Sequence, residues 1–571
     1  MSGRPVWQRA DNRAVVGLLV GLGSAVLQLA PALGRGYVLV RDMVFVPRLP
    51  LTGLLLGRDG VPRAVPSDLL VALLSRIVPG DVVQDVVLLL TITIAGWGAA
   101  RLLNSRSVWA AAAAAALYTW NPYVTERLRL GQWAVLIGYA ALPWVASAAI
   151  SVREGRRWSG AMLLVALGAS ATGGASAQLL AVVVAIPVLL WPGSAVAWWR
   201  RAGVFGIGFV VTALPWLVPS LLQPTAQPPD RVGVALFATR PDTPFGSLDS
   251  LLSLGGVWNA QVVPAGRDHL IVGLAALVVT AAACYGLTQL RGRWSDGALG
   301  GLIAAGVVGL AIAMWGVTPG ARGVLEHLVA DVPAAGLLRD GQRWVAPLAL
   351  LLSLGLGGLT ELLVQRWRWR AAVIIAVPVA LLPAAAWGAD GTLVAVHWPG
   401  DWQQIATASG QLPAGPVLVL PWASERGYPW NAERPQADPT DHWLPRRVVG
   451  DDALQVGHTS TAVEDPVARR IAAAATGTAS LLPTLRNQGY AGVLLQRDQP
   501  GAGAAAQRVT GLPVVRSSGA LTLYAVPGSR RVAVRRAPLV PILVGDLLAA
   551  LGLLTAVTMC VAKRTRSLKG V

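Results

Sequence analysis

Long apolar runs alternate along the chain with short arginine-rich connections and a few long polar ones. About 20 helical residues cross the ~30 Å hydrocarbon core of a bilayer. Apolar runs of this kind start near residues 14, 82, 108, 133, 159, 175, 203, 269, 297, 345, 371 and 538. The pattern predicts an α-helical polytopic membrane protein with about twelve spanning helices. Two runs, 109–120 and 161–172, are short for a full span and predict broken or tilted helices.

The positions of the basic residues predict how the apolar runs are oriented across the membrane. Arg4, Arg9 and Arg13 precede the first apolar run, and the later arginine and lysine clusters follow the even-numbered runs. Basic residues concentrate in cytoplasmic loops, so both termini are expected in the cytoplasm of a bacterial plasma membrane. The first run is followed by many others, which favours a membrane anchor over a cleaved signal peptide. On this topology the long connections all face outward: 34–81, 120–132, 223–268, 318–343 and 389–536.

The last long connection differs from the others in composition. It is rich in polar residues and proline, and it contains short β-rich runs at 416–420, 491–495 and 521–525. Such runs predict an extracytoplasmic α/β domain before the last membrane helix. The expected division is therefore a transmembrane domain at 1–388, an α/β domain at 389–537, and a last helix with a basic cytoplasmic tail at 538–571.

The composition of the chain supports an integral membrane protein and argues against several other classes of protein. Hydrophobic residues make up 54% and charged residues 13% of the chain, whereas about a quarter of a soluble domain is charged. The net charge of +18 is spread over short clusters between apolar runs, so nucleic acid is not an expected partner. Phosphate-binding glycine motifs are missing from the sequence, and its five histidines show no metal-site spacing. No cofactor is expected to be required, and a divalent metal has no support in the sequence.

The first long loop carries a candidate catalytic carboxylate. Arg41 and Asp42 precede an apolar stretch, 43–47, that suits the membrane surface. Asp42 is the candidate general base, because a carboxylate can take the proton of a sugar hydroxyl as that hydroxyl attacks. Partial burial beside lipid would raise its pKa toward a useful range. The alternatives are a charge pair between Asp42 and Arg41 or a simple loop cap.

The second cluster lies in the hairpin 120–132. Asn121 and Pro122 can end one helix and turn the chain, and Glu126 and Arg127 add charges to a short helical stretch. Arg127 or Arg129 could hold a lipid phosphate, because a guanidinium offers a bidentate fork to phosphate oxygens. The alternative is interfacial anchoring by snorkelling side chains.

The third cluster stands directly before the tenth apolar run. Arg339, Asp340, Gln342 and Arg343 place four hydrogen-bonding groups within five residues. Asp340 alone could be a helix N-cap. The two arginines are expected at the same membrane depth as Asp42, where they could neutralise the phosphate of a departing lipid carrier. With Arg41, Glu126 and Arg127, these four residues form the predicted substrate-binding set.

Aromatic residues gather in the α/β segment. Exposed aromatic rings stack well on sugars, and buried ones form domain cores, so the sequence leaves both roles open. The residues are Trp398, Trp402, Trp422, Tyr428, Trp430 and Trp443.

The outward first loop, the Asn121-Pro122-Tyr123 hairpin and the 339–344 segment together resemble the polytopic GT-C glycosyltransferases. Among these, the chain is most similar to actinobacterial membrane proteins related to the arabinofuranosyltransferases of cell-wall synthesis. The resemblance implies an acidic base in the first outer loop, at Asp42, a polyprenyl-phosphate sugar donor and inversion at the anomeric carbon. The first loop has a single Asp42 rather than a carboxylate pair, so the metal dependence of some members does not carry over.

These observations favour a glycosyltransferase that moves an arabinofuranose- or mannose-type sugar from a polyprenyl-phosphate donor to an envelope glycan or glycolipid. The expected partners are the lipid-linked donor, the glycan acceptor and membrane lipids. A transporter or flippase for lipid-linked glycans is the first alternative, although most charges lie at the ends of apolar runs rather than within them. A non-catalytic scaffold in envelope assembly is the second.

Overall fold

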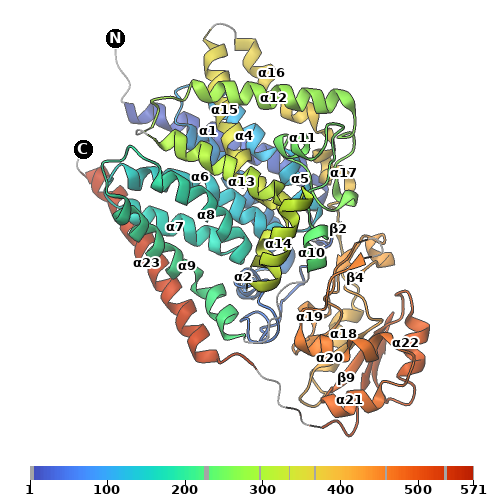
Figure 1. Cartoon of the computed structure of the whole chain (residues 1–571). Helices are drawn as coiled ribbons and strands as arrows, with labels where there is room; N and C mark the ends of the chain where they lie inside the picture. The colour runs from blue at the N-terminus through green and yellow to red at the C-terminus, as the bar shows by residue number, and fades with distance from the viewer. Residues whose placement is uncertain are drawn as a thin grey trace.

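A computed structural model describes residues 6–223, 231–294, 297–332, 335–365, 368–456, 459–530, 532 and 536–569. Figure 1 shows two parts, a large helical part and a smaller region built around a β-sheet at one end of it. The second part is called the sheet region below and covers residues 395–525. The last helix, α23, runs back from that end along the flank of the helical part, beside α9 (Figure 1).

The helical part contains the long apolar helices and several short ones between them. They are α1 (Val6–Leu29), α2 (Ser67–Leu74), α3 (Gly80–Leu103), α4 (Val108–Thr119), α5 (Pro122–Arg129), α6 (Trp133–Arg153), α7 (Ser159–Ala171), α8 (Gly174–Leu190), α9 (Trp198–Leu222), α10 (Arg231–Leu236), α11 (Ser247–Leu252), α12 (Leu270–Thr288), α13 (Ala298–Trp315), α14 (Pro319–Asp331), α15 (Ala346–Val364), α16 (Arg368–Leu381), α17 (Ala386–Gly391) and α23 (Leu539–Lys569).

Each of the twelve predicted apolar runs is helical, but fewer than twelve helices are long enough to span a bilayer. In the described residues eight helices meet that length, or nine if the bent pair 369–381 and 383–391 is one span. The difference lies in α4, α7 and α8, which have 12, 13 and 17 residues. The protein is thus multi-pass, with several half-length helices packed among full-length ones.

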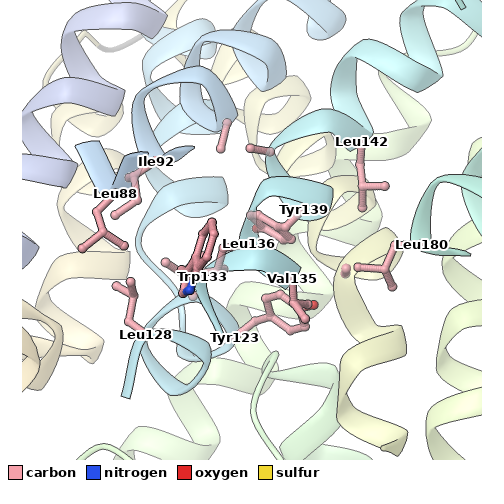
Figure 2. Packing of buried hydrophobic residues seen from close by; sticks show 14 of the residues in the cluster. Leu88, Ile92, Tyr123, Leu128, Trp133, Val135, Leu136, Tyr139, Leu142 and Leu180 are labelled. Carbon is pink, nitrogen blue, oxygen red and sulfur yellow. The ribbon is translucent and has the colours of Figure 1, made fainter. Parts of the chain in front are cut away.

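Two helices form the centre of the helical part. Most of α6 and α15 is buried, and α15 contacts α4, α12 and α13. Figure 2 shows Tyr123 and Leu128 of α5 packed with Trp133 and Tyr139 of α6. The short helix α5 is therefore anchored in the core by its apolar side, which fixes where its polar residues lie.

The sheet region contains a five-stranded mixed sheet of order β10-β11-β9-β3-β6. Strands β3, β6 and β9 are parallel, and β11 and β10 add antiparallel strands at the β9 side. The predicted runs at 416–420, 491–495 and 521–525 form β3, β9 and β11, which confirms them. The five strands are β3 (Val417–Leu420), β6 (Val448–Val449), β9 (Gly492–Gln496), β10 (Val514–Ser518) and β11 (Leu521–Ala525).

Short helices and hairpins complete this region. The helices are α18 (Asp401–Ser409), α19 (Thr440–Trp443), α20 (Pro466–Thr476), α21 (Leu482–Gln488) and α22 (Ala502–Arg508). The remaining strands are β2 (Ala395–Val396), which pairs with β1 (Tyr37–Val38) of the first loop, and the pairs β4 (Glu425–Arg426) with β5 (Gln436–Ala437) and β7 (Gln455–Val456) with β8 (Thr459–Ser460).

The two faces of the sheet bury different partners, because alternate side chains of a strand point to opposite faces. Leu418 of β3 packs with Ile471 of α20 and Leu485 of α21. Val417, one residue earlier, belongs to the cluster that contains Trp402 of α18 and continues into the helical part. One face of the sheet therefore forms the core of the region, and the other joins it to the membrane helices.

Candidate functional site

Asp42 lies at the tip of a tight turn. The turn is closed by two backbone hydrogen bonds between Val40 and Met43, of 2.8 and 3.2 Å, and Arg41 has a φ of 44°. The amide of Asp42 donates to the carbonyl of Leu130 at 3.2 Å. Gly131 permits this approach, since a Cβ there would lie 2.3 Å from the Met43 nitrogen. The turn is thereby fixed against the hairpin that leads into α6.

The other side of the same turn is fixed to the sheet region. The Arg41 amide donates to the Pro435 carbonyl at 2.7 Å, and the Ala437 amide donates to the Arg41 carbonyl at 2.8 Å. The Arg41 guanidinium pairs with Glu425 at 3.3 Å and donates to Gln261 at 2.7 Å. The structure therefore gives Arg41 partners other than Asp42, and the alternative of a simple Arg41–Asp42 charge pair is wrong.

The carboxylate of Asp42 remains accessible to solvent. Its one hydrogen bond from a described side chain comes from the Gln132 amide, at 3.2 Å. Surrounding protein desolvates the group and raises its pKa above the ordinary value, while the Gln132 bond and the charges of Arg41, Arg63 and Arg343 oppose that rise. Asp42 thus combines access to solvent with increased basicity.

Four polar side chains near Asp42 are buried and are called the buried polar layer here: Glu126, Arg127, Asp340 and Gln342. Arg127 is 0% exposed and forms a bidentate pair with Asp340 at 2.6 and 3.0 Å. It also donates to Gln342 and, at 2.5 Å, to Gln132. Gln132 therefore connects Asp42 directly to this layer.

Asp340 is the anionic centre of the layer. It stands at the N-cap position of a short 3₁₀ turn, 341–345, and its carboxylate also pairs with arginine side chains, so capping alone does not describe its role. Its carboxylate contacts Arg127 and, at 3.2 Å, Arg343. Burial alone would raise the pKa of Asp340, but the charges of these two arginines lower it to about 2.

Glu126 lies at the far edge of the layer and is also 0% exposed. It accepts a hydrogen bond from Gln342 at 3.0 Å. Burial, together with the nearby charge of Asp242, raises the pKa of Glu126 well above its ordinary value. Asp242 itself is paired with Arg267 at 2.8 and 3.0 Å. Neither Glu126 nor Arg127 is accessible to solvent. The alternative in which Arg127 is a snorkelling interfacial anchor is therefore wrong.

A second set of charges, called the charged rim here, is linked to Asp42 through the charge of Arg63: Arg63, Arg339, Glu464 and Asp452. Arg63 pairs with Glu464 at 2.7 Å and with Asp452 at 3.6 Å. Arg339 approaches the same Glu464 at 3.3 Å. The first loop, the 339–343 segment and the sheet region thus meet around Asp42.

Arg343 stands between the buried polar layer and the charged rim. Its guanidinium contacts Asp340 and donates to the Ser176 hydroxyl of α8 at 2.8 Å. Its side chain is 13% exposed, against 0% for Arg127. Of the arginines bonded to Asp340, Arg343 is therefore the more accessible one.

The aromatic cluster of the sheet region is mainly core. Trp398 has ring contacts with Trp402, Trp430 and Trp443 at 4.9–5.6 Å. Tyr428 and Trp402 are 1% and 2% exposed. The Trp398 indole also donates to the Phe45 carbonyl at 2.9 Å. Of the two roles left open by the sequence, the structure supports packing and docking onto the first loop.

Two hollows lie away from Asp42. The first has a volume of about 60 Å³ among α4, α12, α15 and α16 and is mostly apolar, with Asn121 and Arg267 in its wall. The second has a volume of about 620 Å³ and lies between the first loop and the sheet region, with Arg48 and Arg76 in its wall. Neither of these two is lined by Asp42. Among the described residues, no group of three or more His, Cys, Asp or Glu side chains is placed to hold a metal ion.

Sequence reasoning missed several members of this arrangement. Gln132 closes the second cluster in sequence, yet its link to Asp42 spans 90 residues. Arg63 and Glu464 are 401 residues apart. A signal was available only for Gln132, a polar residue directly before an apolar run; nothing local distinguishes Glu464 from other acidic residues of its region.

Comparisons with solved structures find the same fold in a larger protein. The chain matches the cryo-EM structure of arabinofuranosyltransferase AftD from Mycobacteria with a TM-score of 0.57 and 19% identity, over 92% of this chain. A mutant form of the same protein matches with a TM-score of 0.58 and 19% identity, also over 92% of this chain. The matches cover 40% and 42% of those chains, so this chain spans about two fifths of their length. No protein-family model and no curated sequence matches it.

Proposed function

We propose that this protein is an inverting GT-C glycosyltransferase that moves an arabinofuranose- or mannose-type sugar from a polyprenyl-phosphate donor to an envelope glycan or glycolipid. The reaction takes place at the outer face of the membrane, with both termini in the cytoplasm. The observation that carries the proposal is the setting of Asp42, an accessible carboxylate with a raised pKa, held by Gln132 and surrounded by arginines. The fold shared with AftD supports it.

In this proposal Asp42 is the general base. The acceptor hydroxyl attacks the anomeric carbon, its proton passes to Asp42, and the bond from that carbon to the phosphate oxygen breaks. A carboxylate of raised pKa takes the proton more readily than an ordinary one. The polyprenyl phosphate leaves with the bonding electrons.

Arginines near Asp42 receive the phosphate. Arg343 and Arg63 are close enough for their charges to act on Asp42, and Arg339 shares Glu464 with Arg63. Guanidinium groups bind phosphate oxygens through paired hydrogen bonds and stabilise the charge that develops on a leaving phosphate. Arg127, Asp340, Gln342 and Glu126 are buried, and their role is to hold Gln132 and Arg343 in position. Arg41 holds the Asp42 turn against the sheet region.

The test is Asp42→Asn, which keeps the shape of the side chain and removes its basicity. Membranes containing the full chain are supplied in parallel with polyprenyl-phosphate arabinofuranose and polyprenyl-phosphate mannose. A general base contributes roughly 10²- to 10⁴-fold, so transfer should fall by that factor while the amount of folded protein stays constant. Asp268→Asn, an exposed carboxylate in another loop at this end, serves as the matched control and should keep full activity.

A second candidate function is a non-catalytic scaffold for lipid-linked glycans. The observation in its favour is that neither hollow described above is lined by Asp42. The same assay separates the two. Equal transfer by wild type and Asp42→Asn rejects Asp42 as the base, and the lack of transfer by the wild type from either donor favours the scaffold.

A further inference from the structure

The larger hollow lies at the junction of the two parts of the molecule, and Asp42 is not among the residues that line it. Arg48 and Arg76 line it from the helical part, and Gln403 and Trp443 line it from the sheet region. In Figure 1, α2 faces α18 and α19 at this junction. Its volume of about 620 Å³ is sufficient for a polar headgroup. It is called the junction pocket below.

The two arginines give the junction pocket a net positive charge. Both side chains are exposed, and within the described part of the chain neither has a hydrogen bond or an ion pair. No Asp or Glu is among the described residues that line the pocket. This contrasts with Arg63, Arg127 and Arg267, each of which is paired with a carboxylate. Unpaired guanidinium groups facing one hollow are a binding site for an anion, and they suit phosphate in particular.

The rim of the junction pocket is apolar and leads to the lipid-facing surface. Ile77 and Val78 line the pocket and are 82% and 39% exposed. Exposed apolar residues continue from Leu73 on α2 to Val82 and Val86 on α3, a candidate membrane span. The spacing of four residues between Val82 and Val86 keeps them on one face of the helix. An apolar path therefore joins the two arginines to the surface that acyl chains cover.

Trp443 supplies a further polar group without a partner. Its side chain is 8% exposed, and the indole Nε1 has no acceptor among the described residues. Buried N–H groups are normally hydrogen-bonded, and an unmet one costs free energy. A ligand oxygen in the junction pocket would provide the missing acceptor.

We propose that the junction pocket binds the phosphate headgroup of an anionic phospholipid from the surrounding bilayer. Arg48 and Arg76 hold the phosphate, the Trp443 indole donates to a headgroup oxygen, and the acyl chains lie along Ile77 and α3. Because the pocket has walls from both parts of the molecule, the bound lipid joins the sheet region to the helical part. This site is separate from Asp42 and does not depend on the glycosyltransferase proposal.

The experiment uses the full chain, delipidated in a neutral detergent, with binding measured by native mass spectrometry and by the shift of Tm. Phosphatidylglycerol should bind and raise Tm in a saturable way, since a ligand of the native state stabilises it. Phosphatidylcholine at the same concentration should not. The double variant Arg48→Gln/Arg76→Gln should weaken phosphatidylglycerol binding by roughly 10- to 30-fold, because each arginine near a membrane surface adds favourable free energy. Arg35→Gln is the matched control, an exposed arginine of the same loop outside the pocket, and should bind normally.

Trp443→Phe tests the indole separately. If the N–H serves the headgroup, this variant weakens phosphatidylglycerol binding by roughly 3- to 10-fold. The smaller ring also leaves space in the aromatic cluster, so Tm without lipid should fall, and binding is compared at a temperature where both forms are folded. The proposal is overturned if phosphatidylcholine binds as well as phosphatidylglycerol, or if the double variant binds as tightly as the wild type. Equal stabilisation by inorganic phosphate alone would overturn the lipid assignment in favour of a site for the free anion.

Discussion

Asp42 and Asp340 are joined through Gln132 and Arg127, yet their surroundings differ in every respect that matters for chemistry. Asp340 is 3% exposed and lies between two arginines, which lower its pKa to about 2. Asp42 is accessible, has one amide donor among the described side chains, and has a raised pKa. Identical carboxyl groups are thus set for different tasks, one to hold charges in place and the other to exchange a proton.

The buried polar layer and the charged rim also differ in whether a ligand can replace their internal ion pairs. The charged pair of the buried polar layer, Arg127 with Asp340, is already bonded, and loss of one partner leaves the other buried charge uncompensated. The charged rim is partly exposed, so water screens it and a ligand can replace its internal pairs. The layer should therefore control stability and position, and the rim should control binding.

The largest effect is expected at Asp340. Asp340→Asn leaves Arg127 buried without its counter-charge, so the free energy of unfolding should fall by about 3 to 5 kcal/mol. Unfolding by denaturant in detergent micelles measures it. Asp42→Asn is the control and should change the same quantity by less than about 0.5 kcal/mol, as for other accessible sites. Equal losses in the two variants would remove the distinction between the two carboxylates.

Gln132→Leu removes the hydrogen bonds that connect Asp42 to the buried polar layer. Its amide N–H favours the ionised form of Asp42, so its loss should raise the pKa of Asp42 further. The acid limb of the pH–rate profile should then move to higher pH, and transfer near neutral pH should fall roughly tenfold. A purely structural role for Gln132 predicts a lower rate with an unmoved acid limb.

His442 of α19 connects the sheet region to α2 of the helical part. It contacts Asp441 at 2.6 Å and Asp68 of α2 at 3.6 Å, and these carboxylates raise its pKa from 6.5 to about 10 despite partial burial. A raised pKa in the folded state means that its contribution is complete below pH 6.5 and is lost as pH rises through 10. His442→Gln should remove on the order of 1 to 2 kcal/mol of stability at pH 6.5.

The measurement for His442 is the free energy of unfolding between pH 6.5 and 10. In the wild type the His442 contribution should decline over this range, and in the variant that decline should be absent. Asp390→Asn, a charge change outside these contacts, controls for general electrostatic effects. A pH dependence identical in His442→Gln and wild type would contradict the assignment.

The smallest effect on stability is expected in the charged rim. Glu464→Gln removes the carboxylate shared by Arg63 and Arg339 and leaves Arg63 its longer contact with Asp452, yet partly exposed ion pairs contribute only about 0 to 1 kcal/mol. The freed arginines should bind the donor phosphate better, so KM for the donor should fall roughly 2- to 5-fold at low salt. Steady-state kinetics at two ionic strengths check this. An increased KM would mean that Glu464 contacts the substrate instead of competing with it.

Much of the fold follows from local sequence patterns. The twelve apolar runs are all helical, and three predicted β-rich runs became β3, β9 and β11. The prediction of about twelve spans was too high, because α4, α7 and α8 satisfy apolar composition but not length. Helix α2, inside a predicted loop, was missed because its eight residues are too few to give a clear period.

The sequence predicted which segments form the candidate site but not the contacts between their side chains. The loops containing Asp42, Arg127 and Asp340 do meet at one end of the helical part. The roles of these residues differ from the predicted ones because residue type does not determine exposure. Arg127 is buried in an ion pair with Asp340, 213 positions away. Arg41 pairs with Glu425, 384 positions away.

The sequence by itself determined that this is a multi-pass membrane protein with a β-sheet region before its last helix. Transfer of apolar segments out of water depends on local composition and period, which a linear sequence contains in full. Only the tertiary structure decided that Asp340 is locked between arginines while Asp42 stays accessible. Coulomb energy and desolvation depend on distances and burial, and these arise when segments far apart in the chain pack together.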